Sequence, residues 1–169
     1  MPSNVVKIVF VGAGGAGKSA TAYRLANGAF RETMMTIGLD IDTWSLSDED
    51  TGGHVKIAAF DLGGQEQFRF FQDRFVAGAE CVLILVDMTR WISLDEVDEW
   101  IDLIRHIPKD RWLLIANKAD AATTMSEEDI KEKAEELGIS YIVVSAKTGD
   151  NFDNLSKMIS DLVFNDVEN

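Results

Sequence analysis

The chain has 169 residues, of which 46% are hydrophobic, so it is long enough to form one compact domain with a substantial core. Its 16 basic and 29 acidic residues give a formal net charge of −13. Nucleic acids and anionic membranes are held by clustered Lys and Arg, so this charge disfavours both as partners. The single cysteine excludes an internal disulfide framework and predicts a cytoplasmic location.

We expect neither a leader nor a lipid anchor at the ends of the sequence. Residues 1–4 run directly into an apolar segment, without the charged region and cleavage site of a secretory signal. Pro2 stands where N-myristoylation needs glycine, and residues 165–169 contain no cysteine for prenylation. The sequence therefore predicts a monomeric cytoplasmic protein.

Short apolar runs alternate with segments of helical periodicity. The runs are rich in Val, Ile, Leu and Phe and cover residues 5–11, 55–60, 81–86, 112–116 and 140–144. Continuous apolarity predicts strands that are covered on both faces, as in a parallel sheet between helices. The polar segment 48–53 predicts a hairpin turn, and the order of the elements predicts a three-layer α/β domain.

Three helices can be predicted with their boundaries. Ser93 with Glu96, and Ser126 with Asp129, have the spacing of a capping box and predict two helix starts. The second helix should end at Gly138, because glycine suits the left-handed conformation after a last turn. Apolar positions predict a third helix near the C-terminus: Phe152, Leu155, Ile159, Leu162 and Val163. Three tryptophans are expected to pack in the core or against helices: Trp91, Trp100 and Trp112.

Residues 12–19, Gly-Ala-Gly-Gly-Ala-Gly-Lys-Ser, satisfy the pattern G-x-x-x-x-G-K-[ST] between a predicted strand and a predicted helix. Glycines let backbone N–H groups point into such a loop, and the helix N-terminus adds positive potential. Lys18 can reach the β and γ phosphates, and the Ser19 hydroxyl can bind Mg²⁺. A chance match has odds of about one per cent at average glycine usage. The motif predicts a nucleoside triphosphate site but does not choose the base.

The segment Asn117-Lys118-Ala119-Asp120 follows an apolar run and points to guanine. A carboxylate at Asp120 can accept two hydrogen bonds from the N1–H and N2–H₂ edge of guanine, whereas adenine offers no such pair. Asn and Asp also form ordinary turns, and alone that alternative is about as probable. The later loop Ser145-Ala146-Lys147 favours base recognition, because a backbone N–H there can meet the guanine O6.

Together these motifs resemble those of the Ras-like small GTPases, and the resemblance spans nearly the whole chain. Thr36 in Thr-Ile-Gly resembles the threonine of the first switch, and Asp61-Leu-Gly-Gly-Gln65 resembles the D-x-x-G-Q of the second. Phe30 falls where the family often packs an aromatic edge on guanine, with a core phenylalanine as an equal alternative. The resemblance implies a P-loop NTPase fold of the Ras-like G-domain type. Its sheet would be six-stranded and mostly parallel, with one antiparallel edge strand and helices on both faces.

The resemblance also implies a single G domain over 1–169, with a phosphate loop, two switches and a set of site residues. The motif bounds are 12–19 for the phosphate loop, about 30–38 for switch I and about 61–78 for switch II. Nucleotide binding is assigned to Gly14, Gly15, Ala16, Gly17, Lys18, Ser19, Ala20, Phe30, Thr36, Gly64, Asn117, Lys118, Asp120, Ser145, Ala146 and Lys147. Mg²⁺ is assigned to Ser19, Thr36 and Asp61, and catalysis to Gln65, Lys18 and Thr36.

Hydrolysis of GTP needs a positioned water and neutralisation of the phosphate charge. The resemblance assigns the water to a residue but assigns no arginine to the neutralisation of charge. Gln65 would orient the water. Arg31, Arg69 and Arg74 flank the switches and are candidates for an arginine that acts in cis. The preferred interpretation is that they are surface charges, and that slow hydrolysis awaits an activating protein.

The switches and the strands between them are the expected surface for effectors, exchange factors and activating proteins. Ile41 and Phe60 match positions of the apolar patch that effectors of Rab proteins bind, and Trp44 has the opposite parity and should pack beneath the hairpin. The second switch contains four further aromatics, and at least one should be exposed: Phe68, Phe70, Phe71 and Phe75. Residues 36–38 and 62–65 resemble Arf proteins, and residues 68–79 resemble Rab and Ras proteins. Such a mixture resembles small GTPases of prokaryotes.

Two other classes of function compete with a hydrolysing switch. A scaffold that holds GTP or GDP permanently would not need both Gln65 and Thr36. A nucleoside or nucleotide kinase would need a second substrate pocket and an arginine-rich lid, which residues 119–139 do not provide. The sequence therefore predicts a small GTPase that binds GTP or GDP with Mg²⁺ and acts as a molecular switch.

Overall fold

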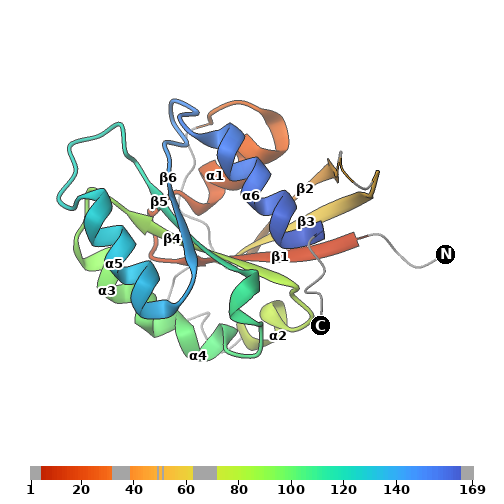
Figure 1. Ribbon diagram of the computed structural model, residues 1–169, viewed down its shortest axis with the longest axis horizontal. Helices are drawn as coiled ribbons and strands as arrows, with labels where there is room; N and C mark the ends of the chain where they lie inside the picture. Colours follow the sequence, from red (N-terminus) through yellow and green to blue (C-terminus); the bar gives the residue numbers. More distant parts are fainter. Residues whose placement is uncertain (1–4, 32–38, 49, 51, 63–71, 165–169) are drawn as a thin grey trace.

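The computed structural model describes residues 5–31, 39–48, 50, 52–62 and 72–164. Its centre is a six-stranded sheet in the order β2-β3-β1-β4-β5-β6 (Figure 1). The strands are β1 (Val5–Gly12), β2 (Leu39–Ser47), β3 (His54–Leu62), β4 (Cys81–Asp87), β5 (Trp112–Asn117) and β6 (Ser140–Val143). The edge strand β2 is antiparallel to β3, and the other pairings are parallel. The predicted α/β fold, with its hairpin and antiparallel edge strand, is confirmed.

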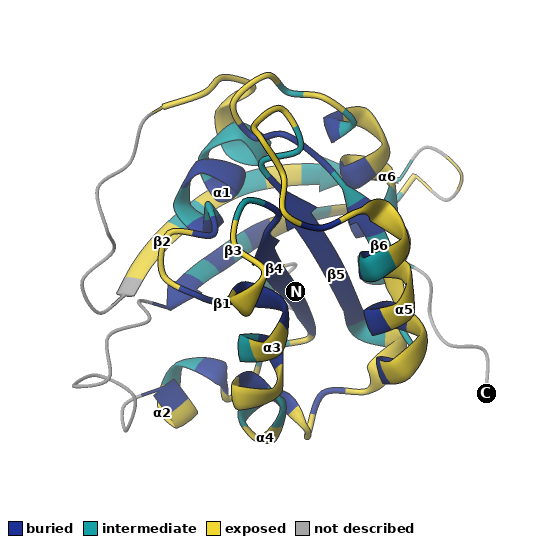
Figure 2. Ribbon diagram, turned by 90° about the vertical axis from the view of Figure 1, so that its left-hand side faces the viewer, coloured by how far each residue is buried: buried dark blue, intermediate teal, exposed yellow. Residues whose placement is uncertain are grey.

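Helices cover both faces of this sheet. They are α1 (Lys18–Asn27), α2 (Gln72–Val76), α3 (Ile92–Asp95), η2 (Glu96–Trp100), α4 (Ile101–Ile104), η3 (Lys109–Arg111), α5 (Glu127–Leu137) and α6 (Phe152–Phe164). One buried cluster lies between the sheet and α1 and α6, and the other lies beneath α2, α3, η2, α4 and α5 (Figure 2). The central strands β4 and β5 are buried along their whole length, as their continuous apolarity predicted. Within the described ranges, none of the helices has the length and apolarity that a membrane crossing requires.

The two predicted capping boxes have opposite outcomes. Ser126 caps α5, because its hydroxyl accepts from the Asp129 N–H and the Asp129 carboxylate accepts from the Ser126 N–H, and the helix ends at Gly138 with φ 73°. Ser93 is not a cap, and that prediction is wrong. α3 begins one residue earlier, and the buried Ser93 hydroxyl lies 2.9 Å from the Asp87 carbonyl oxygen instead. A tight turn after β4 leads directly into the helix. The Ser93 hydroxyl therefore contacts backbone carbonyl oxygens of this turn and does not cap the helix.

The aromatic predictions divide in a similar way. Trp100 and Trp112 are buried in the core, and Trp44 packs against the cluster beneath α1 and α6. Trp91 is 48% exposed, so the expectation of core or helix packing is wrong for this residue. It lies immediately after the turn that ends β4, where the chain runs along the surface before α3. Phe30 is also exposed, which excludes the alternative of a core phenylalanine that closes α1.

The five parallel strands bring five chain segments to one edge of the sheet. β1, β3, β4, β5 and β6 all end there, and the segment after each carboxyl end therefore starts close to the others. The Gly-rich loop follows β1, Asp61 lies near the end of β3, and Asp87 and Asn117 are the last residues of β4 and β5. Open α/β sheets bind ligands at this edge.

Candidate functional site

The loop between β1 and α1 passes very close to its neighbours at two glycines. Gly12 has φ 137°, and a Cβ on it would lie 2.3 Å from the backbone oxygen of Leu85 in β4. Gly17 has φ 91°, and a Cβ there would lie 2.1 Å from Nδ2 of Asn117. Both positions need glycine for conformation and for space. By contrast, a Cβ on Gly14 or Gly15 would meet no atom within 4 Å, so the middle of the loop faces open space.

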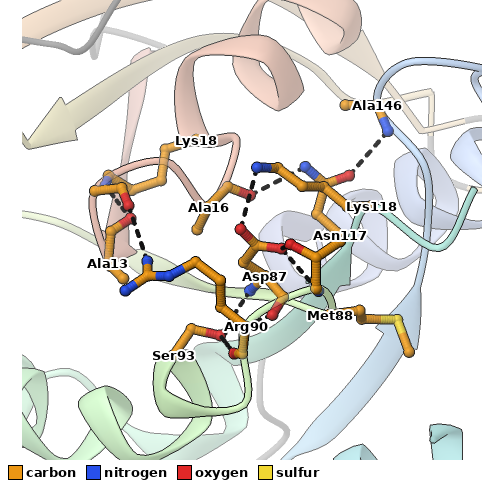
Figure 3. A network of polar contacts seen from close by, with 12 residues as sticks. Ala13, Ala16, Lys18, Asp87, Met88, Arg90, Ser93, Asn117, Lys118 and Ala146 are labelled. Atoms are coloured by element: carbon orange, nitrogen blue, oxygen red, sulfur yellow. Dashed lines mark hydrogen bonds and ion pairs between the residues drawn. The ribbon is translucent and has the colours of Figure 1, made fainter. Parts of the chain in front are cut away.

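Lys18 forms the floor of this loop. Its side chain folds back so that Nζ donates to the carbonyl oxygens of Gly12 and Ala13, at 3.0 and 3.2 Å (Figure 3). The residue is only 6% exposed. Burial lowers the pKa of the Lys18 ammonium from its ordinary value, and the nearby Asp61 charge partly opposes that shift. A buried cation with carbonyls on one side is suited to an anionic ligand on the other.

Ser19 and Asp61 meet next to Lys18. The Ser19 hydroxyl donates to Oδ2 of the buried Asp61 carboxylate, across 42 positions of sequence. One residue comes from the first turn of α1 and the other from the end of β3. A hydroxyl and a carboxylate together are hard oxygen donors of the kind that Mg²⁺ prefers.

Asn117 links the phosphate loop to the loop after β6. Its Nδ2 donates to the Ala16 carbonyl oxygen at 3.0 Å, and its Oδ1 accepts from the Ala146 N–H at 2.9 Å (Figure 3). Asn117 and Ala146 are each 2% exposed. The loop 145–147 was predicted to offer a backbone N–H to guanine O6; the N–H of Ala146 is used by Asn117, so it can serve a base only as a shared donor. The two predicted halves of the site form one connected structure.

The neighbouring side chains are also fixed. Lys118 has φ 69°, and its Nζ lies 3.1 Å from Oδ2 of the buried Asp87. Asp120 is exposed, and its Oδ1 accepts from the Ser145 hydroxyl at 2.6 Å. Ser145 is fully buried, so its hydroxyl orients the Asp120 carboxylate, whose two oxygens have lone pairs beyond this one bond.

The sequence model described as the Ras family matches residues 7–165. The chain belongs to the Ras family. It is 30% identical to the Ras-related protein RabC of Dictyostelium discoideum over 167 residues, which are 96% of this chain and 83% of that protein. It is 32% identical to the Ras-related protein Rab-1 of Theileria parva, over 93% of this chain and 75% of that protein. The chain is 30% identical to the Ras-related protein SEC4 of Saccharomyces cerevisiae, over 95% of this chain and 77% of that protein.

Family membership establishes the class of activity. The chain is a small GTPase that binds guanine nucleotides, hydrolyses GTP and acts as a nucleotide-dependent switch with regulatory and effector partners. The alternative of a permanently loaded scaffold is not favoured, and the predicted Ras-like resemblance is confirmed. Two of these three relatives carry Rab names, whereas the resemblance to prokaryotic small GTPases stays a prediction.

Several predicted residues of this GTPase lie outside the described ranges, and their roles stay predictions: Thr36, Gly64, Gln65, Phe68, Phe70 and Phe71. Ile41 and Phe60 are direct partners across β2 and β3, and Ile41 is 47% exposed. Phe60 and Phe75 are both partly buried and pack against the core cluster on the α2 side of the sheet. Within the described residues, the exposed member of the predicted partner surface is therefore Ile41, with Phe60 directly beside it.

Arg24 of α1 is a site residue that sequence reasoning missed. Its Nε donates to the Ala146 carbonyl oxygen at 2.6 Å, and its Nη2 donates to that of Lys147 at 3.0 Å. The guanidinium also lies 5.7 Å from the centroid of the Phe152 ring. The helix that begins at the phosphate loop thereby holds the base-side loop in place. No local signal predicts this contact, because its partners are more than 120 positions away.

Asp87 was also missed, although a signal for it exists. It closes the apolar run of β4 just as Asn117 closes that of β5, and the two are register partners. Its Oδ1 accepts from the N–H and the hydroxyl of Thr89, at 2.9 and 2.6 Å, while Oδ2 faces Lys118. The signal is its place in the sequence, because a carboxylate that ends a buried parallel strand lies at this edge of the sheet.

We expect Arg24→Ala to accelerate GDP release about tenfold, because two hydrogen bonds that hold the loop of Ala146 and Lys147 are lost. Stopped-flow release of a fluorescent GDP analogue measures this rate. The matched control is Arg111→Ala, since Arg111 makes the same kind of bond, 2.7 Å to the Leu162 carbonyl oxygen, away from the site. Equal release rates in the two variants would refute the role of Arg24.

Proposed function

We propose that this GTPase binds GTP and Mg²⁺ at the edge of the sheet where the parallel strands β1, β3, β4, β5 and β6 end. The observation that carries this proposal is the pair of hydrogen bonds that the Asn117 side chain makes, one with Ala16 of the phosphate loop and one with Ala146 of the base-side loop. It fixes the distance between a phosphate-binding half and a base-binding half. In the phosphate half, backbone N–H groups of the loop would meet the phosphates: Gly14, Gly15, Ala16, Gly17, Lys18, Ser19 and Ala20.

For Mg²⁺, we propose Ser19 and Thr36 as direct ligands, with Asp61 holding the surrounding water. The Ser19–Asp61 contact supports this assignment, because two hard oxygen donors already lie together beside the loop. Mg²⁺ at this point would neutralise phosphate charge. Thr36 lies outside the described residues, so its part rests on the family resemblance.

For the base, we propose that the Asp120 carboxylate accepts from the N1–H and N2–H₂ edge of guanine. Its bond to Ser145 supports this, because the hydroxyl orients the carboxylate before a ligand arrives. The stem of Lys118, anchored at Asp87, and the exposed Phe30 are proposed to pack on the ring. The Ala146 N–H would share its hydrogen between Asn117 and guanine O6. Lys147, the next residue of this loop, is also proposed to bind the nucleotide.

For the reaction, we propose that Gln65 orients the attacking water and that the Gly64 N–H and Lys18 hold the γ-phosphate. Lys18 is supported by its place at the floor of the loop. Loss of the γ-phosphate would release Thr36 and Gly64, and the altered switch loops would then be recognised by partners.

For partners, we propose an apolar contact centred on Ile41 and Phe60, extended by the aromatics of the second switch. The exposure of Ile41 and its direct pairing with Phe60 support such a contact. We also propose a single G domain over 1–169, which the family match over 7–165 supports. We further propose that the protein is a monomer and that it is cytoplasmic, the location that the single cysteine supports.

The test is to denature the purified protein, identify the released nucleotide by chromatography, and repeat this after incubation with Mg²⁺ and GTP. We expect GDP at first and conversion of added GTP to GDP afterwards. Release of an adenine nucleotide would contradict the base assignment.

In the same assay, Gln65→Leu should keep nucleotide binding and slow hydrolysis at least about tenfold, because the water loses its orienting amide. Gln72→Leu is a useful control, since this buried glutamine lies in α2 of the same region. Wild-type hydrolysis in Gln65→Leu would refute the catalytic assignment.

A further inference from the structure

Arg90 lies beside the phosphate loop in a position that no sequence motif assigns. It follows β4 by three residues, and its Nη1 lies 3.4 Å from the Gly14 carbonyl oxygen, to which it donates (Figure 3). Gly14 and Gly15 are exposed, and the space where their side chains would be is open. The loop thus has a buried ammonium, Lys18, as its floor and an exposed guanidinium at its rim.

The backbone of Arg90 is held firmly. Its N–H donates to the Asp87 carbonyl oxygen at 3.0 Å, and its own carbonyl accepts from the Ser93 N–H at 3.0 Å. The Ser93 hydroxyl oxygen makes a second contact with this carbonyl and lies 2.7 Å from the Arg90 carbonyl oxygen. Asp87 is itself fixed by Thr89 and Lys118. The base of the side chain is therefore preorganised next to the site, which lowers the entropic cost of using it.

The guanidinium remains able to change partners. Its second described contact is Glu96, with Nη2 to Oε1 at 3.8 Å and side-chain exposures of 44% and 26%. An exposed ion pair of this length contributes little, so a phosphate can displace the carboxylate at small cost. A guanidinium has five N–H donors in a planar fork, so the bond to Gly14 can persist while other donors bind oxygen.

The arginines that flank the switches are placed less favourably. Arg31 stacks over the Tyr23 ring, 4.1 Å from its centroid, and Arg74 is exposed on the short helix α2. Arg69 lies outside the described residues. Among the arginine contacts that the structure describes, the one to the phosphate loop is made by Arg90.

We propose that Arg90 is an arginine that acts in cis in GTP hydrolysis, a proposal that rests on GTP binding in the phosphate loop. A water oxygen forms a bond to the γ-phosphorus, and the bond from that phosphorus to the β–γ bridging oxygen breaks. The electron pair stays on the bridging oxygen, which becomes a terminal oxygen of GDP, and the water protons leave with inorganic phosphate. Arg90 donates hydrogen bonds to the γ-phosphoryl oxygens while this charge redistributes.

The test is binding of aluminium fluoride, a mimic of the transferred phosphoryl group, to the protein loaded with Mg²⁺ and a fluorescent GDP analogue. No activating protein is added, and fluoride is titrated at fixed aluminium while the fluorescence is followed. Affinity for the GDP analogue alone is measured first in each variant. Absence of GDP binding to wild type would overturn the proposed function itself, which separates that failure from failure of the Arg90 proposal.

We expect wild type to form the fluoride adduct and Arg90→Ala to need at least about tenfold more fluoride, with GDP affinity within about threefold of wild type. Arg90→Lys should recover part of the effect, because it keeps the charge and loses the planar fork. Arg105→Ala is the matched control, since Arg105 is an exposed arginine paired with Asp102. It should behave as wild type.

Three results would overturn the proposal. The first is an equal fluoride requirement in Arg90→Ala and wild type, and the second is no adduct with wild type. The third is a parallel loss of GDP affinity and adduct formation in Arg90→Ala, because that pattern belongs to a residue that only braces the Gly14 carbonyl. Single-turnover GTP hydrolysis should fall in the same order as adduct affinity across the variants.

Discussion

Lys18→Ala is expected to weaken GDP and GTP binding about a thousandfold, or about 4 kcal/mol, and so to abolish tight binding. The Lys18 ammonium is buried with carbonyls of Gly12 and Ala13 on one side, so bound phosphate would be its counter-charge. Charge-assisted bonds in a buried site are the strong class of hydrogen bond, and their loss exceeds that of a surface pair. Equilibrium titration with a fluorescent GDP analogue measures the affinity.

The fold should survive this substitution. Burial lowers the pKa of Lys18, which means that the folded protein disfavours the charged form. Without nucleotide, the unfolded chain binds this proton more tightly, so wild-type stability should rise as pH increases toward 10.5, the ordinary value. Lys18→Met, which keeps the packing of the stem, should lack this rise and should be at least as stable as wild type at neutral pH.

A second buried lysine provides the control for this experiment. Lys133 is 8% exposed and lies 2.8 Å from Asp98, far from the phosphate loop in the fold. Lys133→Ala leaves the Asp98 carboxylate without this partner and should lower stability while nucleotide affinity stays at the wild-type level. If both lysine variants lost affinity equally, the effect of Lys18 would be one of folding and not of phosphate binding.

Local patterns in the sequence were sufficient for most of the fold. Continuous apolar runs gave the strands of the parallel sheet, because burial on both faces leaves no polar alternation. The capping box at Ser126 and the glycine at 138 gave both ends of α5. The same pattern failed at Ser93, since a serine hydroxyl bonds whichever backbone group is nearest, and there the turn after β4 was nearer.

The site was predictable where motif spacing is local and not where contacts cross the chain. The phosphate loop and Asp120 follow from a few consecutive residues. The arginine contacts join positions 76 to 123 apart, and periodicity carries no information about such partners. The exposure of Trp91 was missed for a related reason. An aromatic residue next to a buried strand is usually packed, but the turn after β4 places Trp91 at the surface.

Asp120→Asn is expected to reverse the base preference from guanine to xanthine, with a change of about a hundredfold or more in the affinity ratio. The carboxylate accepts from two donors of guanine, whereas a carboxamide offers one donor and one acceptor. Xanthine presents a carbonyl oxygen in place of the guanine amino group, so the amide can pair with it. Competition of GDP and xanthosine diphosphate against a fluorescent nucleotide measures the ratio.

Ser145→Ala separates recognition from orientation at this site. The variant keeps the carboxylate and loses the 2.6 Å bond that orients it. Guanine affinity should fall about tenfold or less while the preference over xanthine remains, because a mobile carboxylate still has two acceptor oxygens. Unchanged guanine preference in Asp120→Asn would remove Asp120 from base recognition. The guanine selectivity would then have to come from the loop of Ala146, which Asn117 and Arg24 hold from both sides.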